Sequence, residues 1–150
     1  MRVRFKLAAA ILLLAGSLNV PTNAFAQEAA DPSGTWLTQA GDAKVHVSRC
    51  GGSVCGVVVW LRQPIDQMTG QPAVDDKNPN PSLRRRPVIG LPLFSDMRST
   101  GPASWAGRIY NADDGGTYDS DIAMTGPNTL RVNGCVGALC GGENWTRSRR

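Results

Sequence analysis

The stretch from Val45 to Arg62 reads VHVSRCGGSVCGVVVWLR, and it decides the fold. Its first residues alternate between apolar and polar with a period of two, which is the pattern of a half-buried strand. Gly56 to Leu61 is continuously apolar, which indicates a strand covered on both faces. Cys50 and Cys55 flank the four residues between these segments. The stretch therefore predicts two antiparallel strands joined by a tight turn that a disulfide can staple.

The same spacing returns near the end of the chain, at Cys135 and Cys140. Four cysteines allow three connectivities. Closing a six-residue loop stabilises by about 2 kcal/mol and a long loop by nearer ~4.6 kcal/mol, so energy alone does not choose. Residues that flank a hairpin turn can face each other about 5.5 Å apart, which a disulfide can bridge. Geometry therefore favours Cys50–Cys55 and Cys135–Cys140, with crossed pairing as the alternative. The spacing is longer than that of redox pairs or zinc knuckles, which favours structural disulfides.

The N-terminus has the order of a secretory signal peptide. Arg2, Arg4 and Lys6 precede the apolar run Leu7 to Leu14, and Ala24-Phe25-Ala26 offers a small-x-small cleavage site. The run is too short to span a bilayer, and no later stretch is long and apolar enough to do so. We therefore predict a Sec signal peptide over residues 1–26, cleavage near Ala26, and a location in the periplasm or outside the cell.

The signal peptide changes the charge argument. The chain has 16 Lys+Arg and 12 Asp+Glu, but three of the basic residues and none of the acidic ones lie within residues 1–26. The remainder carries 13 basic against 12 acidic residues, so the basic balance gives little support for a nucleic-acid partner. Residues 27–150 have the length of a single domain that buries roughly two-thirds of its unfolded surface.

Short strands separated by turn signals occupy most of this domain. We expect them at residues 34–37, 44–48, 56–61, 91–94, 104–110, 117–124, 129–133 and 143–147. No amphipathic helical stretch of useful length is present. The pattern predicts an all-β fold, namely an eight-stranded up-and-down antiparallel barrel, which closes on itself and leaves no exposed edge strand.

Residues 63–92 interrupt the strand pattern with six prolines and three successive arginines. A segment this long is typical of a functional or disordered loop rather than a hairpin connection. Its scattered apolar residues indicate that it packs on the domain. We expect a long, irregular Pro/Arg-rich loop.

Several motifs together resemble one protein family. They are Gly34-x-Trp36, Cys50-Gly51 with Cys55-Gly56, Val59-Trp60-Leu61, Asn78-Pro79, Leu83-Arg84-x-Arg86-Pro87-x-x-Gly90, Trp105-x-Gly107-x-Ile109-Tyr110, and Gly134-Cys135 through Trp145-Thr146-Arg147. This set resembles domain of unknown function 2147, a family of small exported bacterial proteins, over essentially the whole chain after the signal peptide. The resemblance implies a lipocalin-like (calycin-like) barrel and almost nothing about activity.

Trp36 and Arg147 support the barrel independently. Lipocalin-type barrels pair a Gly-x-Trp on the first strand with a basic residue on the last strand, whose cation lies across the indole. Trp36 and Arg147 stand in those places, and such a contact contributes about 0.5–2 kcal/mol. We assign both residues a structural role.

Four candidate ligand-binding residues are expected to line the barrel interior, together with Met124 and Leu130. They are Trp60, Trp105, Tyr118 and Ile122. An eight-stranded barrel is either filled by its own side chains or holds one small ligand, and the sequence leaves both possibilities open.

Two further candidates, Arg84 and Arg86, lie in the long loop. Extended backbone before Pro87 would point them the same way, toward an anionic headgroup. The alternative, which we favour, is that they pair with Asp75 and Asp76 or with backbone carbonyls and fasten the loop to the barrel.

No catalytic residue, metal site or cofactor is expected. His46 is the only histidine and lies on the polar face of its strand, without a recognisable partner. Asp76-x-Asn78-x-Asn80 opens like a calcium loop, but Pro81 and Pro87 occupy the places that need Gly and Glu. We expect these side chains to cap turns instead.

The sequence thus favours a non-enzymatic protein that binds a small apolar or amphipathic ligand in its barrel. This interpretation rests largely on fold analogy, which is a weak warrant for function. The alternative is a cell-envelope or secreted interaction protein that binds a protein or glycan through loop 63–92. The sequence gives no prediction of oligomeric state.

Overall fold

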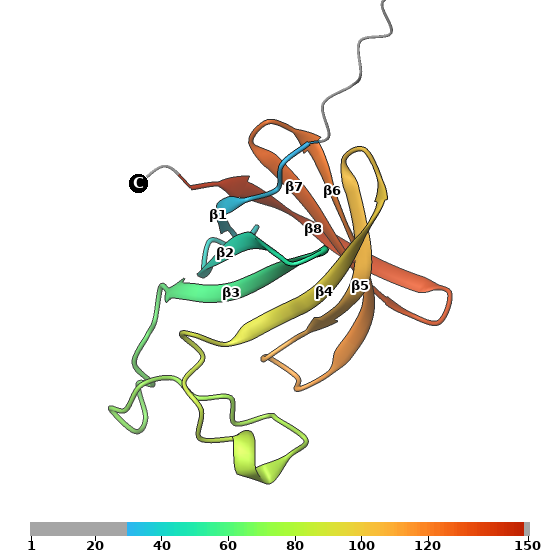
Figure 1. Ribbon diagram of the computed structural model, residues 1–150. Helices are drawn as coiled ribbons and strands as arrows, with labels where there is room; N and C mark the ends of the chain where they lie inside the picture. Colours follow the sequence, from blue (N-terminus) through green and yellow to red (C-terminus); the bar gives the residue numbers. More distant parts are fainter. Residues whose placement is uncertain (1–29, 149–150) are drawn as a thin grey trace, which may run out of the picture.

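The computed structural model describes residues 30–148, and the predicted signal peptide lies outside these residues. Eight strands form a closed antiparallel barrel in chain order (Figure 1). The strands are β1 (Gly34–Leu37), β2 (Ala43–Cys50), β3 (Ser53–Leu61), β4 (Pro92–Gly101), β5 (Ser104–Tyr110), β6 (Thr117–Gly126), β7 (Thr129–Val136) and β8 (Leu139–Arg147). The predicted up-and-down barrel is confirmed. Among residues 30–148, no helix is both long and apolar enough to cross a membrane.

The barrel closes where the first strand meets the last. Trp36 lies opposite Arg147, and Leu37 lies opposite Thr146. Strand β1 also pairs with β2 along its whole length. Every strand therefore has two neighbours, and no backbone edge is left open for another chain.

Both predicted disulfides are confirmed, although the turns are tighter than expected. Cys50–Cys55 joins residues with Cα atoms 5.9 Å apart, and Cys135–Cys140 joins residues 4.1 Å apart. Cys135 lies directly opposite Cys140, whereas Cys50 lies opposite Ser53. Each turn has only two residues, and its first is a glycine with positive φ, 66° at Gly51 and 59° at Gly137. Glycine adopts this conformation without strain, so a two-residue turn is possible. The strands therefore extend into the four residues that were predicted to form each turn.

Strand β4 is also longer than predicted. The sequence indicated a strand only at residues 91–94, but β4 runs from Pro92 to Gly101. Its second half is mostly polar and exposed, with Met97 as the one completely buried side chain there. That half is ordered by pairing with β5 rather than by a hydrophobic pattern of its own.

The interior is filled toward the end of the barrel that carries the β2–β3, β4–β5 and β6–β7 turns. The buried cluster comprises Trp36, Val45, Val47, Val54, Phe94, Met97, Trp105, Ile122, Leu130, Val132 and Trp145. Close packing between the neighbouring strands β3 and β4 requires a glycine at position 56, because a Cβ there would overlap the ring of its partner Phe94. We call this the closed end, and the opposite end the mouth.

The long connection between β3 and β4 lies beside the mouth (Figure 1). It contains one short 3₁₀ helix, Pro81–Leu83, and two isolated bridges, Ile65 to Pro72 and Val74 to Pro87. Backbone bonds join its end to β3, with Val58 donating to Leu91 at 2.9 Å and Gly90 donating to Val58 at 2.8 Å. The loop is irregular, as predicted, and it is fastened to the barrel.

Candidate functional site

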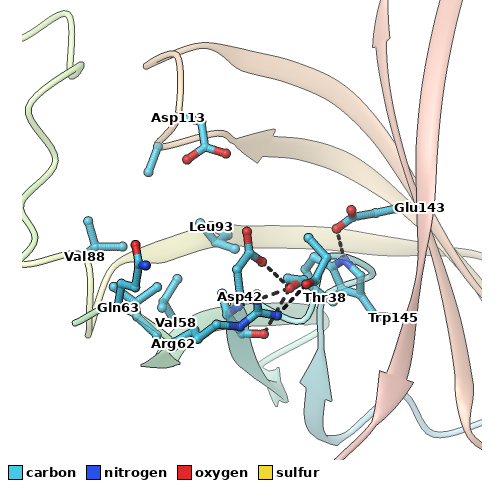
Figure 2. Close-up of a pocket in the computed structure, with 14 residues that line it drawn as sticks. Thr38, Asp42, Val58, Arg62, Gln63, Val88, Leu93, Asp113, Glu143 and Trp145 are labelled. Atoms are coloured by element: carbon cyan, nitrogen blue, oxygen red, sulfur yellow. Dashed lines mark hydrogen bonds between the residues drawn. The ribbon is translucent and has the colours of Figure 1, made fainter. Parts of the chain in front are cut away.

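A cavity of about 590 Å³ opens at the mouth (Figure 2). Residues of the β1–β2 turn, β2, β3, the long loop, β4, the β5–β6 turn and β8 line it. The lining consists of Thr38, Ala40, Asp42, Ala43, Val58, Leu61, Arg62, Gln63, Val88, Leu93, Ala112, Asp113, Glu143 and Trp145. The barrel is thus filled at the closed end and hollow at the mouth, in the size range of sites for small organic molecules.

Apolar side chains and one indole form the walls next to the core. Val58 and Trp145 are buried, and Ala43 and Leu93 are half-buried. The indole Nε1–H of Trp145 donates to Glu143 Oε1, whose carboxylate is half-buried beside it (Figure 2). This bond fixes the orientation of both side chains, so the cavity presents a carboxylate next to an aromatic surface.

Polar groups stand around the cavity opening. The Thr38 hydroxyl donates to Asp42 Oδ1 at 2.6 Å, which holds that carboxylate in the β1–β2 turn. Arg62 donates from Nε to the Gly41 carbonyl at 3.0 Å and from Nη2 to the Ala40 carbonyl at 2.6 Å. Its guanidinium therefore braces the turn.

A second cavity of about 550 Å³ lies under the long loop. It shares Leu61, Val88, Ala112 and Asp113 with the mouth cavity, so the two spaces adjoin. Residues of the loop between Asp66 and Asp76 form its remaining wall. The loop therefore acts as a side wall that extends the mouth.

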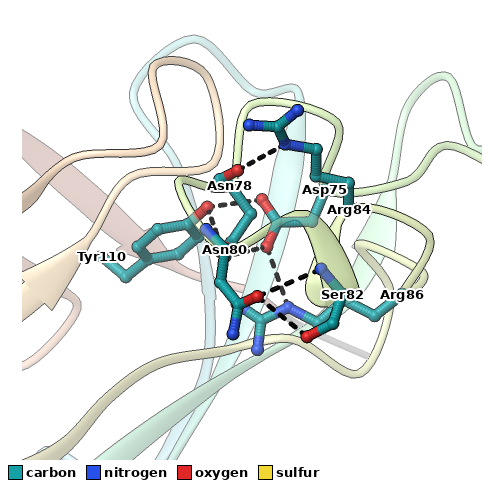
Figure 3. A network of polar contacts seen from close by, with 7 residues as sticks. All are labelled: Asp75, Asn78, Asn80, Ser82, Arg84, Arg86 and Tyr110. Carbon is teal, nitrogen blue, oxygen red and sulfur yellow. Dashed lines mark hydrogen bonds and ion pairs between the residues drawn. The ribbon is translucent and has the colours of Figure 1, made fainter.

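A buried carboxylate holds this wall in place (Figure 3). Asp75 is completely buried and accepts hydrogen bonds from Tyr110 Oη at 2.5 Å, Asn78 Nδ2 at 2.8 Å and Arg86 Nε at 2.8 Å. The Arg86 guanidinium also lies 5.6 Å from the centre of the Tyr110 ring. Tyr110 ends β5, so these contacts connect the loop to the barrel wall. We call Asp75, Asn78, Arg86 and Tyr110 the loop clamp.

The clamp also sets the ionisation of its members. Burial acts to raise the pKa of Asp75, but the hydrogen bonds from Tyr110, Asn78 and Arg86 outweigh it and leave the pKa below its ordinary value of 3.8. Burial and the neighbouring carboxylate raise the pKa of Tyr110 above 10.0. Asp75 is therefore the anionic centre of the clamp over the physiological pH range.

The β5–β6 turn supports the wall from the other side. Asp114 accepts a hydrogen bond from the Gly116 amide at 2.7 Å and from the Tyr118 hydroxyl at 2.7 Å, and these bonds lower the pKa of Asp114. The neighbouring Gly115 has φ 74° and packs so closely that a Cβ there would overlap the Lys77 carbonyl. Glycine is thus required where the turn meets the loop.

The predicted interior residues do not all lie in the barrel interior. Trp105 and Ile122 are buried in the core cluster, and Tyr118 contacts the β5–β6 turn through its hydroxyl. Trp60 does not line the interior, so that expectation is wrong. Its side chain is 39% exposed and lies under the Lys44 ammonium, 5.3 Å from the ring centre.

A single extra residue explains the position of Trp60. Lys44 lies opposite Trp60 and Val45 lies opposite Val58, so Val59 is unmatched and forms a bulge in β3. Because side chains alternate between the two faces of a strand, one inserted residue moves every following side chain to the other face.

The contacts of the two loop arginines match the alternative in which they fasten the loop to the barrel. Arg86 pairs with Asp75 as described, and Arg84 Nε donates to the Asn78 carbonyl at 2.7 Å (Figure 3). Neither lines the mouth cavity. The interpretation that they fasten the loop therefore fits the observed contacts better than an anion site.

The calcium-like segment caps turns, as expected. Asn78 Oδ1 accepts from the Asn80 amide at 2.9 Å, and Asn80 Oδ1 accepts from the Ser82 amide at 3.1 Å at the start of the 3₁₀ helix. Asp76 pairs with Lys77 at 3.2 Å. His46 is exposed and contacts the Thr35 hydroxyl at 3.3 Å through Nδ1. Within residues 30–148, no group of three or more His, Cys, Asp or Glu side chains is arranged to hold a metal ion.

Glu143, Trp145, Asp42 and Asp113 were not predicted as site residues. The signal for the first two is the alternation along β8, in which residues two apart share a face. The sequence indicated that strand only from residue 143, so its inward face toward the mouth was not recognised. Asp42 and Asp113 lie in turns, where acidic residues ordinarily serve the turn itself.

Comparisons with known proteins agree with this architecture. The solved structure described as "Protein HP1028 from the human pathogen Helicobacter pylori belongs to the lipocalin family" aligns with a TM-score of 0.67 at 24% sequence identity, over 80% of this chain and 84% of that chain. At that identity the likeness shows a shared fold. A search of curated proteins gives no significant match. The family model described as "Uncharacterized protein conserved in bacteria (DUF2147)" matches residues 34–147, and the chain belongs to this family.

Proposed function

We propose that this protein is an exported binding protein that holds a small, partly apolar molecule in the mouth cavity. The observation that carries the proposal is the division of the barrel interior. Side chains fill the closed end, whereas a cavity of about 590 Å³ lined by both apolar and polar side chains remains at the mouth. Ligand sites of small-molecule binding proteins combine these features.

Export is supported by the cysteines and the family. Both disulfides are formed, and no free cysteine occurs in residues 30–148. Structural disulfides are typical of proteins outside the reducing cytosol, and the family is bacterial. These features fit the predicted signal peptide and a periplasmic or secreted location. Mass spectrometry of the mature N-terminus tests this part, with cleavage near Ala26 as the expected result and an intact Met1 as the contrary one.

Thermal shift measurements against a library of lipids and metabolites test the binding proposal. Ala43 lines the cavity, so Ala43→Phe should fill part of it and abolish the shift. Ala106 lies in β5, next to Trp105 and therefore on the outer face of the barrel, so Ala106→Phe adds the same ring outside and serves as the matched control. No shift with any compound, or equal shifts in both variants, would contradict binding in the mouth.

A second candidate function has one specific observation in its favour. The long loop exposes apolar side chains to solvent, including Met68, which is 96% exposed, and Ile65 and Ile89, which are about 40% exposed or more. Exposed apolar groups gathered on one segment mark interaction surfaces. Under this candidate the loop binds a protein or glycan. A photo-crosslinking residue at position 68 should then capture one specific partner in the source cell, and an equivalent residue at position 106 should not.

A further inference from the structure

We propose that the ligand of the mouth cavity is an organic cation, that is, an amine or guanidinium carried on an apolar body. This inference rests on the proposed function and adds the chemical class of the ligand.

Carboxylates approach the cavity from three separate elements (Figure 2). Asp42 comes from the β1–β2 turn, Asp113 from the β5–β6 turn and Glu143 from β8. The one basic residue in the lining is Arg62, and its guanidinium already donates to two backbone carbonyls of the β1–β2 turn. The cavity wall is therefore net negative, and its single cation is engaged in a structural role.

The adjoining space under the loop has the same sign. Asp66, Asp76 and the shared Asp113 line it; Asp76 is paired with Lys77, and no Arg or Lys lines the space itself. Clefts lined by one sign of charge with apolar walls concentrate ligands of the opposite sign. The adjoining space therefore also favours a cation over an anion.

Glu143 is the group best placed to bind such a cation. One of its oxygens is held by the Trp145 indole, and its carboxylate is half-buried against apolar wall. A cation can form an ion pair with the second carboxylate oxygen while the first stays bonded to the indole N–H. Partial burial strengthens this ion pair relative to one in water.

The arrangement suits an organic cation better than a metal ion or an anion. A bare divalent ion needs several oxygen ligands converging at one point, and residues 30–148 offer no such group. An anion would need free basic groups, but Arg84 and Arg86 hold the loop and do not line the cavity. The apolar walls leave room for the body of an amphipathic molecule.

Isothermal titration of the folded protein with octylamine, octanol and octanoate tests the inference, because the three probes share one chain length and differ in charge. Octylamine is protonated at pH 7. We expect it to bind at least tenfold more tightly than octanoate, with octanol between. Octanoate binding as tightly as octylamine, or more tightly, would overturn the cation assignment and leave the binding proposal standing. Binding of none of the three would overturn the assignment together with the proposed function.

Glu143→Gln keeps the size of the side chain and an acceptor for the Trp145 indole. It should weaken octylamine binding about tenfold and leave octanol binding unchanged. Asp119→Asn removes a charge from an exposed position on β6 and should change neither, so an equal loss in both variants would overturn the role of Glu143. If Glu143→Gln does not fold, Asp113→Asn takes its place. Asp113→Asn should also weaken octylamine binding, but by a smaller factor.

Discussion

The guanidinium of Arg147 lies 4.2 Å from the centre of the Trp36 ring and fastens the last strand of the barrel across the first. Its Nη1 donates to the Ser33 carbonyl at 2.7 Å, and its Nε donates to the Pro127 carbonyl at 3.0 Å. The Trp36 indole in turn donates to the Pro32 carbonyl at 2.8 Å. One side chain thus ties the β6–β7 turn, the segment before β1 and the buried Trp36 together at the closed end.

Arg147→Ala should lower the free energy of unfolding by about 2–3 kcal/mol, because it removes a cation–π contact and two charge-assisted hydrogen bonds. Arg147→Lys should recover only part of this loss, since a lysine ammonium lacks the planar fork that reaches both carbonyls. Urea denaturation measures both. Arg98→Ala on the exposed face of β4 is the control and should stay within about 0.5 kcal/mol of the parent. Full retention of stability in Arg147→Ala would show that closure does not depend on this residue.

Gly34→Ala tests the same contact from the other side. Gly34 has φ 140°, and a Cβ there would overlap Arg147 Nη1. We expect a loss of about 1–3 kcal/mol from backbone strain and displacement of the guanidinium. Gly52→Ala is the matched control, because no atom lies within 4 Å of the added carbon and its φ is not positive. Equal stability of the two variants in thermal denaturation would contradict the close packing of Arg147 on β1.

The Cys50–Cys55 disulfide at the closed end closes a short loop. The double variant Cys50→Ser/Cys55→Ser should lose about 2 kcal/mol, because the bridge closes a loop of only six residues. Peptide mapping of this variant should still recover Cys135 joined to Cys140. A crossed bridge in the parent protein, or no loss of stability in the variant, would be inconsistent with the observed pairing.

The loop clamp should make the protein sensitive to acid. The pKa of Asp75 is lower in the folded chain than its ordinary value, so its contribution to stability is present above about pH 4 and is lost as pH falls through the lowered pKa. Asp75→Asn should destabilise at pH 7 by about 2–3 kcal/mol, since it leaves Arg86 beside a neutral amide, and should flatten the dependence of stability on pH below 5.

Limited trypsin digestion gives the matching local readout. Asp75→Asn should speed cleavage after Arg84 and Arg85, which lie in the exposed part of the loop. Tyr110→Phe should do so less, because it removes the hydrogen bonds to Asp75 and from Asn78 but keeps the ion pair. Cleavage at the parent rate in Asp75→Asn would show that other contacts hold the loop.

The sequence sufficed for features that depend on local pattern. Period-two alternation and turn residues predicted the eight-stranded barrel, the short Cys spacing predicted both disulfides, and the motif at Trp36 with Arg147 predicted the closure contact. Features that depend on a single inserted residue or on distant contacts were not predictable in this way. The bulge at Val59 reverses the face of Trp60 without any change in composition.

The candidate site also depends on distant contacts that the sequence did not predict. Tyr110 and Asp75 meet although 35 residues separate them, and nothing local to either marks the contact. Glu143 and Trp145 line the mouth because the register with β7 sets them opposite the buried Val132 and Leu130, on the inward face of β8. Candidate residues on the interior face were therefore placed correctly in the core where the strands are regular, as for Trp105 and Ile122, and missed at the mouth.

Native mass spectrometry of the protein purified from its own source tests the central claim most directly, because it detects a bound small molecule without assuming its identity. The account predicts a bound molecule on the parent protein and on Ala106→Phe, and none on Ala43→Phe. It also predicts that the released molecule carries an amine or guanidinium. A parent protein that is ligand-free and shows no thermal shift with any library compound would contradict the claim that the mouth of this barrel is a binding site.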